Sequence, residues 1–133
     1  MPADEPTILA TSGGLKPGRR TRFEFNDLVE YALDLSGVSG RAPKMCFLAT
    51  ALGDDRFTIS SFYEAALQRG VAPSHLLSFP MPNLEDATAH LLEQDVVWVF
   101  GGSVAGLLAM WRLHGVDEAM RTEIGRASCR ERV

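Results

Sequence analysis

The tripeptide Gly101-Gly102-Ser103 is the segment of this 133-residue chain whose residue types are best suited to chemistry. It follows the apolar run Val96–Phe100 and precedes an apolar helical pattern that begins at Val104. Glycines let a backbone turn sharply, and the first N–H groups of a helix have no intrahelical acceptor. Such donors can stabilise a phosphate, a carboxylate or the oxyanion of acyl transfer. The tripeptide is equally typical of a plain helix start capped by Ser103, so both interpretations stay open.

Two other apolar runs end in small polar residues. Ser12 and Gly13 follow the run Thr7–Thr11, and Thr50 closes a run that begins at Lys44. In an open α/β sheet, ligands bind beyond the carboxyl ends of the strands. We therefore expect Ser12, Gly13 and Thr50 to line the same site as the glycines.

Several other site chemistries find no support in the residues. The glycines lack the G-x-G-x-x-G spacing of a dinucleotide fold, and the chain contains no G-x-S-x-G nucleophile motif. No two ligand residues stand at the spacing of a metal site, and no motif pairs a histidine with a serine or cysteine. We expect no cofactor, no metal and no catalytic nucleophile in this chain.

Apolar runs, typical of strands, alternate along the chain with amphipathic patterns, typical of helices, and these elements would position the turns. Strands are predicted at Thr7–Thr11, Lys44–Thr50, His75–Phe79 and Asp95–Phe100. Helices are predicted from Asn26 to Leu35, Thr58 to Gln68, Asn83 or Asp86 to Leu92, and Val104 to Leu113, with a further helix starting near Asp117. The alternation predicts an α/β fold with three αβα layers and a mostly parallel sheet.

Composition narrows the class of protein. The chain is 46% apolar with a net charge of −4, which provides no basic surface for nucleic acid or an anionic membrane. Its apolar runs fall far short of the roughly 20 residues of a membrane span, and its acidic N-terminus lacks the features of a signal peptide. The two cysteines provide no disulfide framework. We expect a cytoplasmic protein without nucleic-acid or membrane partners.

The last residues differ from the rest of the chain. Residues 123–133 contain three arginines and no helical or strand period. From Ile124 onward they resemble the translation of a common sequencing adapter. We therefore divide the chain into an α/β region, residues 1–122, and a tail, residues 123–133, that we expect to be artefactual and disordered.

The region from Val97 to Asp117 resembles the glycine-turn segment of the peptidase E family of serine peptidases. The run Trp111-Arg112-Leu113-His114-Gly115 makes this similarity specific, and segments from Ile8 to Asn83 resemble the family in kind and order. The similarity spans residues 7 to 121. It implies a fold like that of class I glutamine amidotransferases and hydrolysis of dipeptides with N-terminal aspartate or related aspartyl bonds.

The resemblance also implies roles for individual residues. Gly101 and Gly102 would supply backbone N–H groups to an oxyanion hole, while Ser103 replaces the asparagine of many members. The family's serine nucleophile lies on the strand after the helix pair that starts at Val104, followed by a histidine and an acidic residue. None of the three occurs here, so the chain is predicted to be truncated after about four strands and to be inactive. The edge of the sheet along Val96–Phe100 is predicted to be exposed.

Two alternatives remain beside the peptidase fragment. The first is a small α/β module that binds an anionic ligand at Gly101, Gly102 and Ser103 without chemistry. The second is a regulatory half-domain that pairs with a separate chain. For the intact enzyme we expect a small peptide substrate, and the sequence does not determine its oligomeric state.

Overall fold

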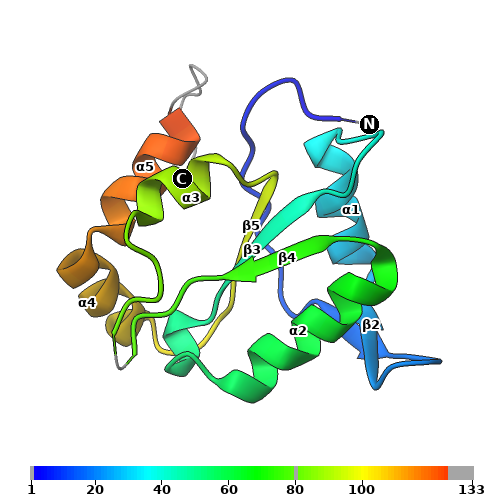
Figure 1. Ribbon diagram of the computed structural model, residues 1–133, viewed down its shortest axis with the longest axis horizontal. Helices are drawn as coiled ribbons and strands as arrows, with labels where there is room; N and C mark the ends of the chain where they lie inside the picture. The colour runs from blue at the N-terminus through cyan, green and yellow to red at the C-terminus, as the bar shows by residue number, and fades with distance from the viewer. Residues whose placement is uncertain (1, 80, 126–133) are drawn as a thin grey trace.

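The computed structural model describes residues 2–79 and 81–125, built around a parallel sheet of three strands (Figure 1). The strand order is β4-β3-β5, so β3 is central and β5 is an edge strand. The bounds are Lys44–Leu48 for β3, Ala72–His75 for β4 and Val96–Val99 for β5. The predicted α/β fold with a parallel sheet is confirmed.

The two faces of the sheet bury two separate apolar cores, because alternate residues of a strand point to opposite faces. On one face, which we call the α1–α2 face, Met45 and Phe47 of β3 pack with Phe62 of α2 and Trp98 of β5. On the other, the α3–α5 face, Cys46 and Leu48 pack with side chains of the last three helices. Strands covered on both sides lose the polar alternation of a half-exposed sheet, which is why β3 is a continuous apolar run.

Five α-helices and one short 3-10 helix (η1) surround the sheet within the described residues. Their bounds are Asp27–Ser36 (α1), Thr50–Leu52 (η1), Arg56–Arg69 (α2), Ala87–Leu92 (α3), Val104–His114 (α4) and Val116–Gly125 (α5). The local sequence explains the ends: Asn26 and Asp86 cap α1 and α3 by accepting N–H bonds, and left-handed glycines close α1, α2 and α4.

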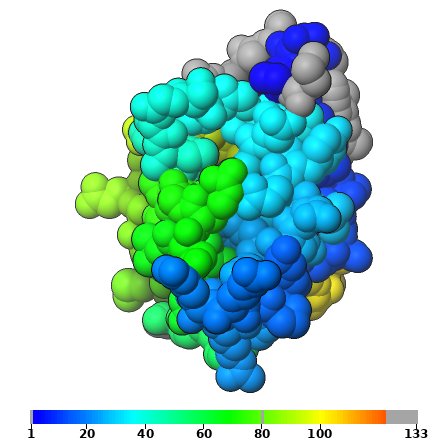
Figure 2. Space-filling view, turned by 90° about the vertical axis from the view of Figure 1, so that its right-hand side faces the viewer, coloured from blue at the N-terminus to red at the C-terminus, as the bar shows by residue number. Residues whose placement is uncertain are grey.

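A hairpin that the sequence did not predict precedes α1. Strand β1, Leu15–Pro17, pairs antiparallel with β2, Phe23–Phe25. Phe25 is buried against Phe62 of α2, with ring centroids 6.1 Å apart. Figure 2 shows the hairpin in blue beside α1 in cyan and α2 in green. Each of these strands has only three residues, and the hairpin contains a proline and several charged side chains, so its alternation of apolar and polar residues is too short to be recognised from the sequence.

Two of the four strand predictions are wrong in part or in full. The third strand is Ala72–His75 rather than His75–Phe79, because the N–H groups of Ser78 and Phe79 bind the Asp54 carboxylate instead of a neighbouring strand. The segment Thr7–Thr11 forms no strand, and most of its residues are exposed. The parallel sheet therefore has three strands rather than four.

The expected domain boundary at residue 122 falls within a helix. Helix α5 continues to Gly125, so the first three residues of the predicted tail are helical. The remaining tail, residues 126–133, lies outside the described part of the chain.

Candidate functional site

The glycine turn, Gly101-Gly102-Ser103, connects the carboxyl end of β5 to the start of α4. Gly102 has φ of +143°, a conformation that side chains rarely adopt, and a Cβ there would lie 2.4 Å from the carbonyl oxygen of Ala51. Ser103 donates its N–H to that same carbonyl at 2.8 Å. The turn is thus held directly against η1, and only glycine fits at its centre.

The contacts of Ser103 leave the two glycines as the available donors. The Ser103 N–H is used by Ala51, and its Oγ accepts the Gly106 N–H at 3.1 Å as the cap of α4. Gly101 and Gly102 are exposed, and among residues 2–79 and 81–125 neither N–H has a protein acceptor. Ser103 therefore has the structural role of a helix cap, while the glycine amides remain open to solvent at a helix N-terminus.

Thr50 stabilises the turn through a hydrogen bond between η1 and α4. Its Oγ1 accepts a hydrogen bond of 3.0 Å from the indole Nε1 of Trp111, and both residues are buried. Thr50 begins η1 and Trp111 lies on α4, so this bond joins the two elements that flank the glycine turn. Thr50 was predicted to line the site, and the structure shows it buried, at 3% exposed, and bonded to Trp111.

Asp54 is a residue of this region that the sequence analysis did not single out. It is 4% exposed and left-handed, with φ of +58°, and its Oδ2 accepts N–H bonds from Ser78 at 2.6 Å and Phe79 at 2.8 Å. Its Oδ1 and the Ser78 hydroxyl are buried, and neither has a hydrogen-bond partner among residues 2–79 and 81–125. The signal in the sequence was an acidic residue directly after Gly53, at a strand end where buried charge needs donors.

Among the described residues, no hydrogen bond joins Ser12 or Gly13 to the glycine turn. Both are exposed, and a Cβ added to Gly13 would meet nothing within 4 Å. Their neighbour Gly14 is buried, with Trp98 and Phe62 about 3 Å from where its Cβ would lie. The structure thus links Thr50 to the glycine turn through η1 and α4, and shows Ser12 and Gly13 only as exposed residues.

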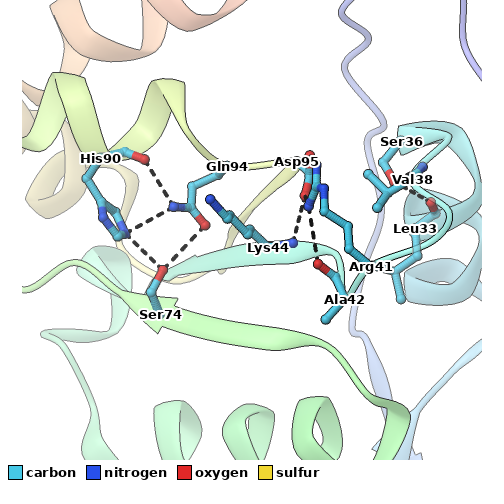
Figure 3. Close-up of polar contacts among 10 residues, drawn as sticks. All are labelled: Leu33, Ser36, Val38, Arg41, Ala42, Lys44, Ser74, His90, Gln94 and Asp95. Carbon is cyan, nitrogen blue, oxygen red and sulfur yellow. Dashed lines mark hydrogen bonds and ion pairs between the residues drawn. The ribbon is translucent and has the colours of Figure 1, made fainter.

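A serine–histidine pair occurs elsewhere, between β4 and α3 (Figure 3). The Oγ of Ser74 lies 2.9 Å from Nε2 of His90, and Gln94 contacts both side chains. Ser74 stands opposite Cys46 in the sheet register, in the middle of the strands. Within the described chain no carboxylate binds the other ring nitrogen of His90, so the pair resembles a helix-to-strand link more than a catalytic dyad.

Two further titratable groups on the sheet have shifted pKa values. Cys46 is fully buried, and burial raises the pKa of its thiol to about 11, which makes it a poor nucleophile at neutral pH. His75 lies against Tyr63, with Nδ1 2.6 Å from the phenol oxygen, and desolvation lowers its pKa. Neither group touches the glycine turn in the described contacts.

The amino ends of the strands carry an ion pair. Arg41 donates to both oxygens of Asp95 at 2.8 and 2.9 Å, and the Lys44 N–H donates to the same carboxylate at 2.8 Å (Figure 3). The Arg41 hydrogen bonds hold the pKa of Asp95 below its usual value. These bonds fix the start of β5 beside the start of β3.

Two other kinds of site are absent from the part of the chain that the structure describes. No three His, Cys, Asp or Glu side chains gather as a metal site would require. No helix there has the length and apolar character to cross a bilayer.

Comparison with known proteins shows the family to which the amino-acid sequence belongs. The model of peptidase family S51 matches residues 8–129. A Bacillus subtilis protein described as the uncharacterized peptidase YgaJ is 39% identical over 114 residues, which are 86% of this chain and 47% of that protein. The chain therefore spans about half the length of this curated relative. No solved structure matches the chain significantly.

Proposed function

The chain belongs to peptidase family S51, and from that premise we propose that it carries the oxyanion-binding half of a serine peptidase active site. The intact enzyme would hydrolyse dipeptides with N-terminal aspartate or related aspartyl bonds. Its serine nucleophile, histidine and acidic partner would come from sequence beyond residue 122. The present chain alone would be inactive, since without the nucleophile and base only binding contributions to catalysis remain.

One observation carries this proposal: two adjacent backbone N–H groups, of Gly101 and Gly102, are free within the described structure and fixed in place. Their turn is anchored because Ser103 binds Ala51, and Gly102 has no room to shift toward η1. An oxyanion hole works by holding donors where negative charge develops, so that no reorganisation is needed during the reaction. A fixed turn at a helix N-terminus, beyond the carboxyl end of a parallel strand, meets that requirement.

The Asp54 carboxylate, through its bonded oxygen Oδ2, and the Thr50–Trp111 bond would act indirectly. Asp54 holds residues 78 and 79 beside η1, and η1 in turn holds the glycine turn. We assign Thr50, Asp54 and Trp111 positioning roles, because their bonds join the elements that surround the turn and none of them is exposed.

A chimera tests the proposal. Residues 1–122 are joined to the part of the Bacillus relative that follows its matched region, and the chimera and the 133-residue chain are assayed on an Asp-initiated dipeptide amide. We expect turnover by the chimera and none by the chain. A folded chimera without activity, or a 133-residue chain as active as the chimera, would contradict the proposal.

A matched pair of variants isolates the oxyanion role. In the chimera, Gly101→Pro removes one N–H donor, whereas Gly101→Ala keeps it and meets no atom within 4 Å. Loss of an oxyanion donor lowers kcat by roughly 100- to 1,000-fold, so the proline variant should show that loss and the alanine variant should stay within a few-fold. If the chimera is inactive but the Gly101→Pro change weakens binding of free aspartate to the 133-residue chain, the anion-binding module is the better description.

A further inference from the structure

The β1–β2 hairpin concentrates positive charge in a chain whose net charge is −4. Its four basic residues are Lys16, Arg19, Arg20 and Arg22. None of the ion pairs formed among the described residues includes one of these side chains. Glu24, the acidic residue of the hairpin, accepts the backbone N–H of Arg19 at 3.1 Å. The basic side chains therefore have no carboxylate partner within residues 2–79 and 81–125, and Figure 2 shows the hairpin in blue at the surface.

Two aromatic rings hold the side chain of Arg22. Its guanidinium carbon lies 5.7 Å from the ring centroid of Phe23 and 5.8 Å from that of Phe57. The backbone is fixed as well, because the Arg22 carbonyl accepts the Gly18 N–H at 3.1 Å, and a Cβ on Gly18 would lie 2.4 Å from the Thr21 carbonyl oxygen. Stacking on a ring orients a guanidinium and leaves the N–H groups at its edge for other partners.

Arg22 and the glycine turn are anchored to the same stretch of chain. Phe57 lies in the first turn of α2, which follows η1 and the carboxyl end of β3. The carbonyl of Ala51 in η1 accepts the Ser103 N–H of the glycine turn. Arg22 is thus held at the end of the sheet where the ligands of open α/β folds bind.

We propose that the β1–β2 hairpin binds a carboxylate of an acidic peptide, and that Arg22 makes the bidentate contact. The planar fork of a guanidinium matches the two oxygens of a carboxylate. The remainder of the chain is acidic, so a small acidic ligand meets less repulsion than an extended polyanion such as a nucleic acid. That the peptide is a substrate rests on the proposed function, whereas the binding itself does not depend on catalysis.

The other basic residues of the hairpin act at longer range. Lys16, Arg19 and Arg20 are exposed, and each adds to a positive field that attracts a negative ligand. Salt screens such attraction between exposed charges. The affinity for an acidic peptide should therefore fall as the ionic strength rises, while the contact at Arg22 determines where the carboxylate binds.

Titration of the 133-residue chain with a blocked tetra-aspartate peptide tests the proposal. The neutral control is the tetra-asparagine peptide with the same acetyl and amide ends. We expect tetra-aspartate to shift the NMR signal of the Arg22 Nε–H group and tetra-asparagine to leave it unchanged. An Arg22 signal that does not move at millimolar tetra-aspartate, or that moves equally with both peptides, would overturn the proposal.

Matched variants separate the contact at Arg22 from general charge. Arg22→Lys keeps the charge and loses the planar fork, so it should weaken tetra-aspartate binding about tenfold. Arg20→Lys makes the same change at an exposed residue without a ring contact in the described structure, and it should stay within about twofold. Phe57→Leu removes one of the two rings and should weaken binding in the same direction as Arg22→Lys. Equal effects of the two lysine variants would show that Arg22 has no special role.

Other anions test the class of ligand. Inorganic phosphate and vesicles that contain phosphatidylserine are titrated under the same salt conditions, and both should bind more weakly than tetra-aspartate. A phosphate or vesicle affinity equal to that of tetra-aspartate would refute the assignment to an acidic peptide.

The chimera distinguishes this inference from the proposed function. If the chimera hydrolyses the Asp-initiated dipeptide amide while the 133-residue chain does not bind tetra-aspartate, the hairpin site is wrong and the peptidase function stands. If tetra-aspartate binds at Arg22 and the folded chimera is inactive, the hairpin site is supported and the peptidase function is contradicted.

Discussion

The two ends of the parallel sheet are built differently. At the amino ends, the Asp95 carboxylate accepts three N–H bonds from Arg41 and Lys44, in relaxed geometry. At the carboxyl ends, Gly102 and Asp54 have positive φ values, and Asp54 Oδ1 has no hydrogen-bond partner in the described part of the chain. Strain and unpaired polar groups cost free energy and persist where function requires them. The contrast supports our proposal that the site lies at the carboxyl ends of the strands.

The largest effect is expected from closing the space at the glycine turn. Gly102→Ala places a Cβ 2.4 Å from the Ala51 carbonyl oxygen and forces alanine into a positive φ. We expect a loss of about 3 kcal/mol or more in the free energy of unfolding. Urea denaturation measures it, with Gly101→Ala as the control, since a Cβ there has no neighbour within 4 Å. Equal stability of the two variants would mean that the turn is not fixed against η1.

The second largest loss of stability is expected at Asp54, the buried acidic residue with a positive φ. Asp54→Ala leaves the N–H groups of Ser78 and Phe79 without their acceptor, which should cost about 2–4 kcal/mol. Asp54→Asn keeps an acceptor oxygen and tolerates a positive φ, so it should cost much less. Thermal or urea unfolding separates them. An asparagine variant as unstable as the alanine variant would show that the negative charge itself is required.

The third effect tests the support beneath the turn. Trp111→Phe and Thr50→Val each leave one buried polar partner unpaired, at an expected cost of about 1–3 kcal/mol. The double variant removes both partners, so it should cost less than the sum of the single variants. A double-mutant cycle in urea measures this coupling, and simple additivity would show that the Trp111–Thr50 bond contributes little.

The smallest effect is expected at the relaxed end. Asp95→Asn weakens an ion pair whose Arg41 side chain is half exposed, so we expect a loss of about 1 kcal/mol at pH 7. Because folding lowers the pKa of Asp95, its contribution exists above the unfolded pKa of about 3.9 and is lost as pH falls through the lower folded pKa. Unfolding midpoints from pH 7 to pH 3 should therefore converge for the two proteins. A gap that stays constant would indicate that the charge of Asp95 is not the cause.

The sequence predicted those parts of the fold that depend on local pattern. The helices are close to their predicted bounds because Asn26, Gly37, Gly70 and Gly115 supply caps that act within a few residues. The central strand β3 was recognised because burial on both faces makes it continuously apolar. The glycine turn was recognised for a similar reason, since it stands between an apolar strand and a helix.

The tertiary structure decided what depends on distant partners. Thr7–Thr11 has the composition of a strand, yet a strand requires a neighbouring strand to pair with, and among the described residues none pairs with this segment. The third strand ended before Phe79 because the Leu77 N–H binds Asn83 and the N–H groups of Ser78 and Phe79 bind Asp54, more than 20 residues away in the chain. In the same way, only the fold brought Ala51 and Thr50 to the glycine turn, so the sequence identified the donors and the tertiary contacts determined which of them stay free.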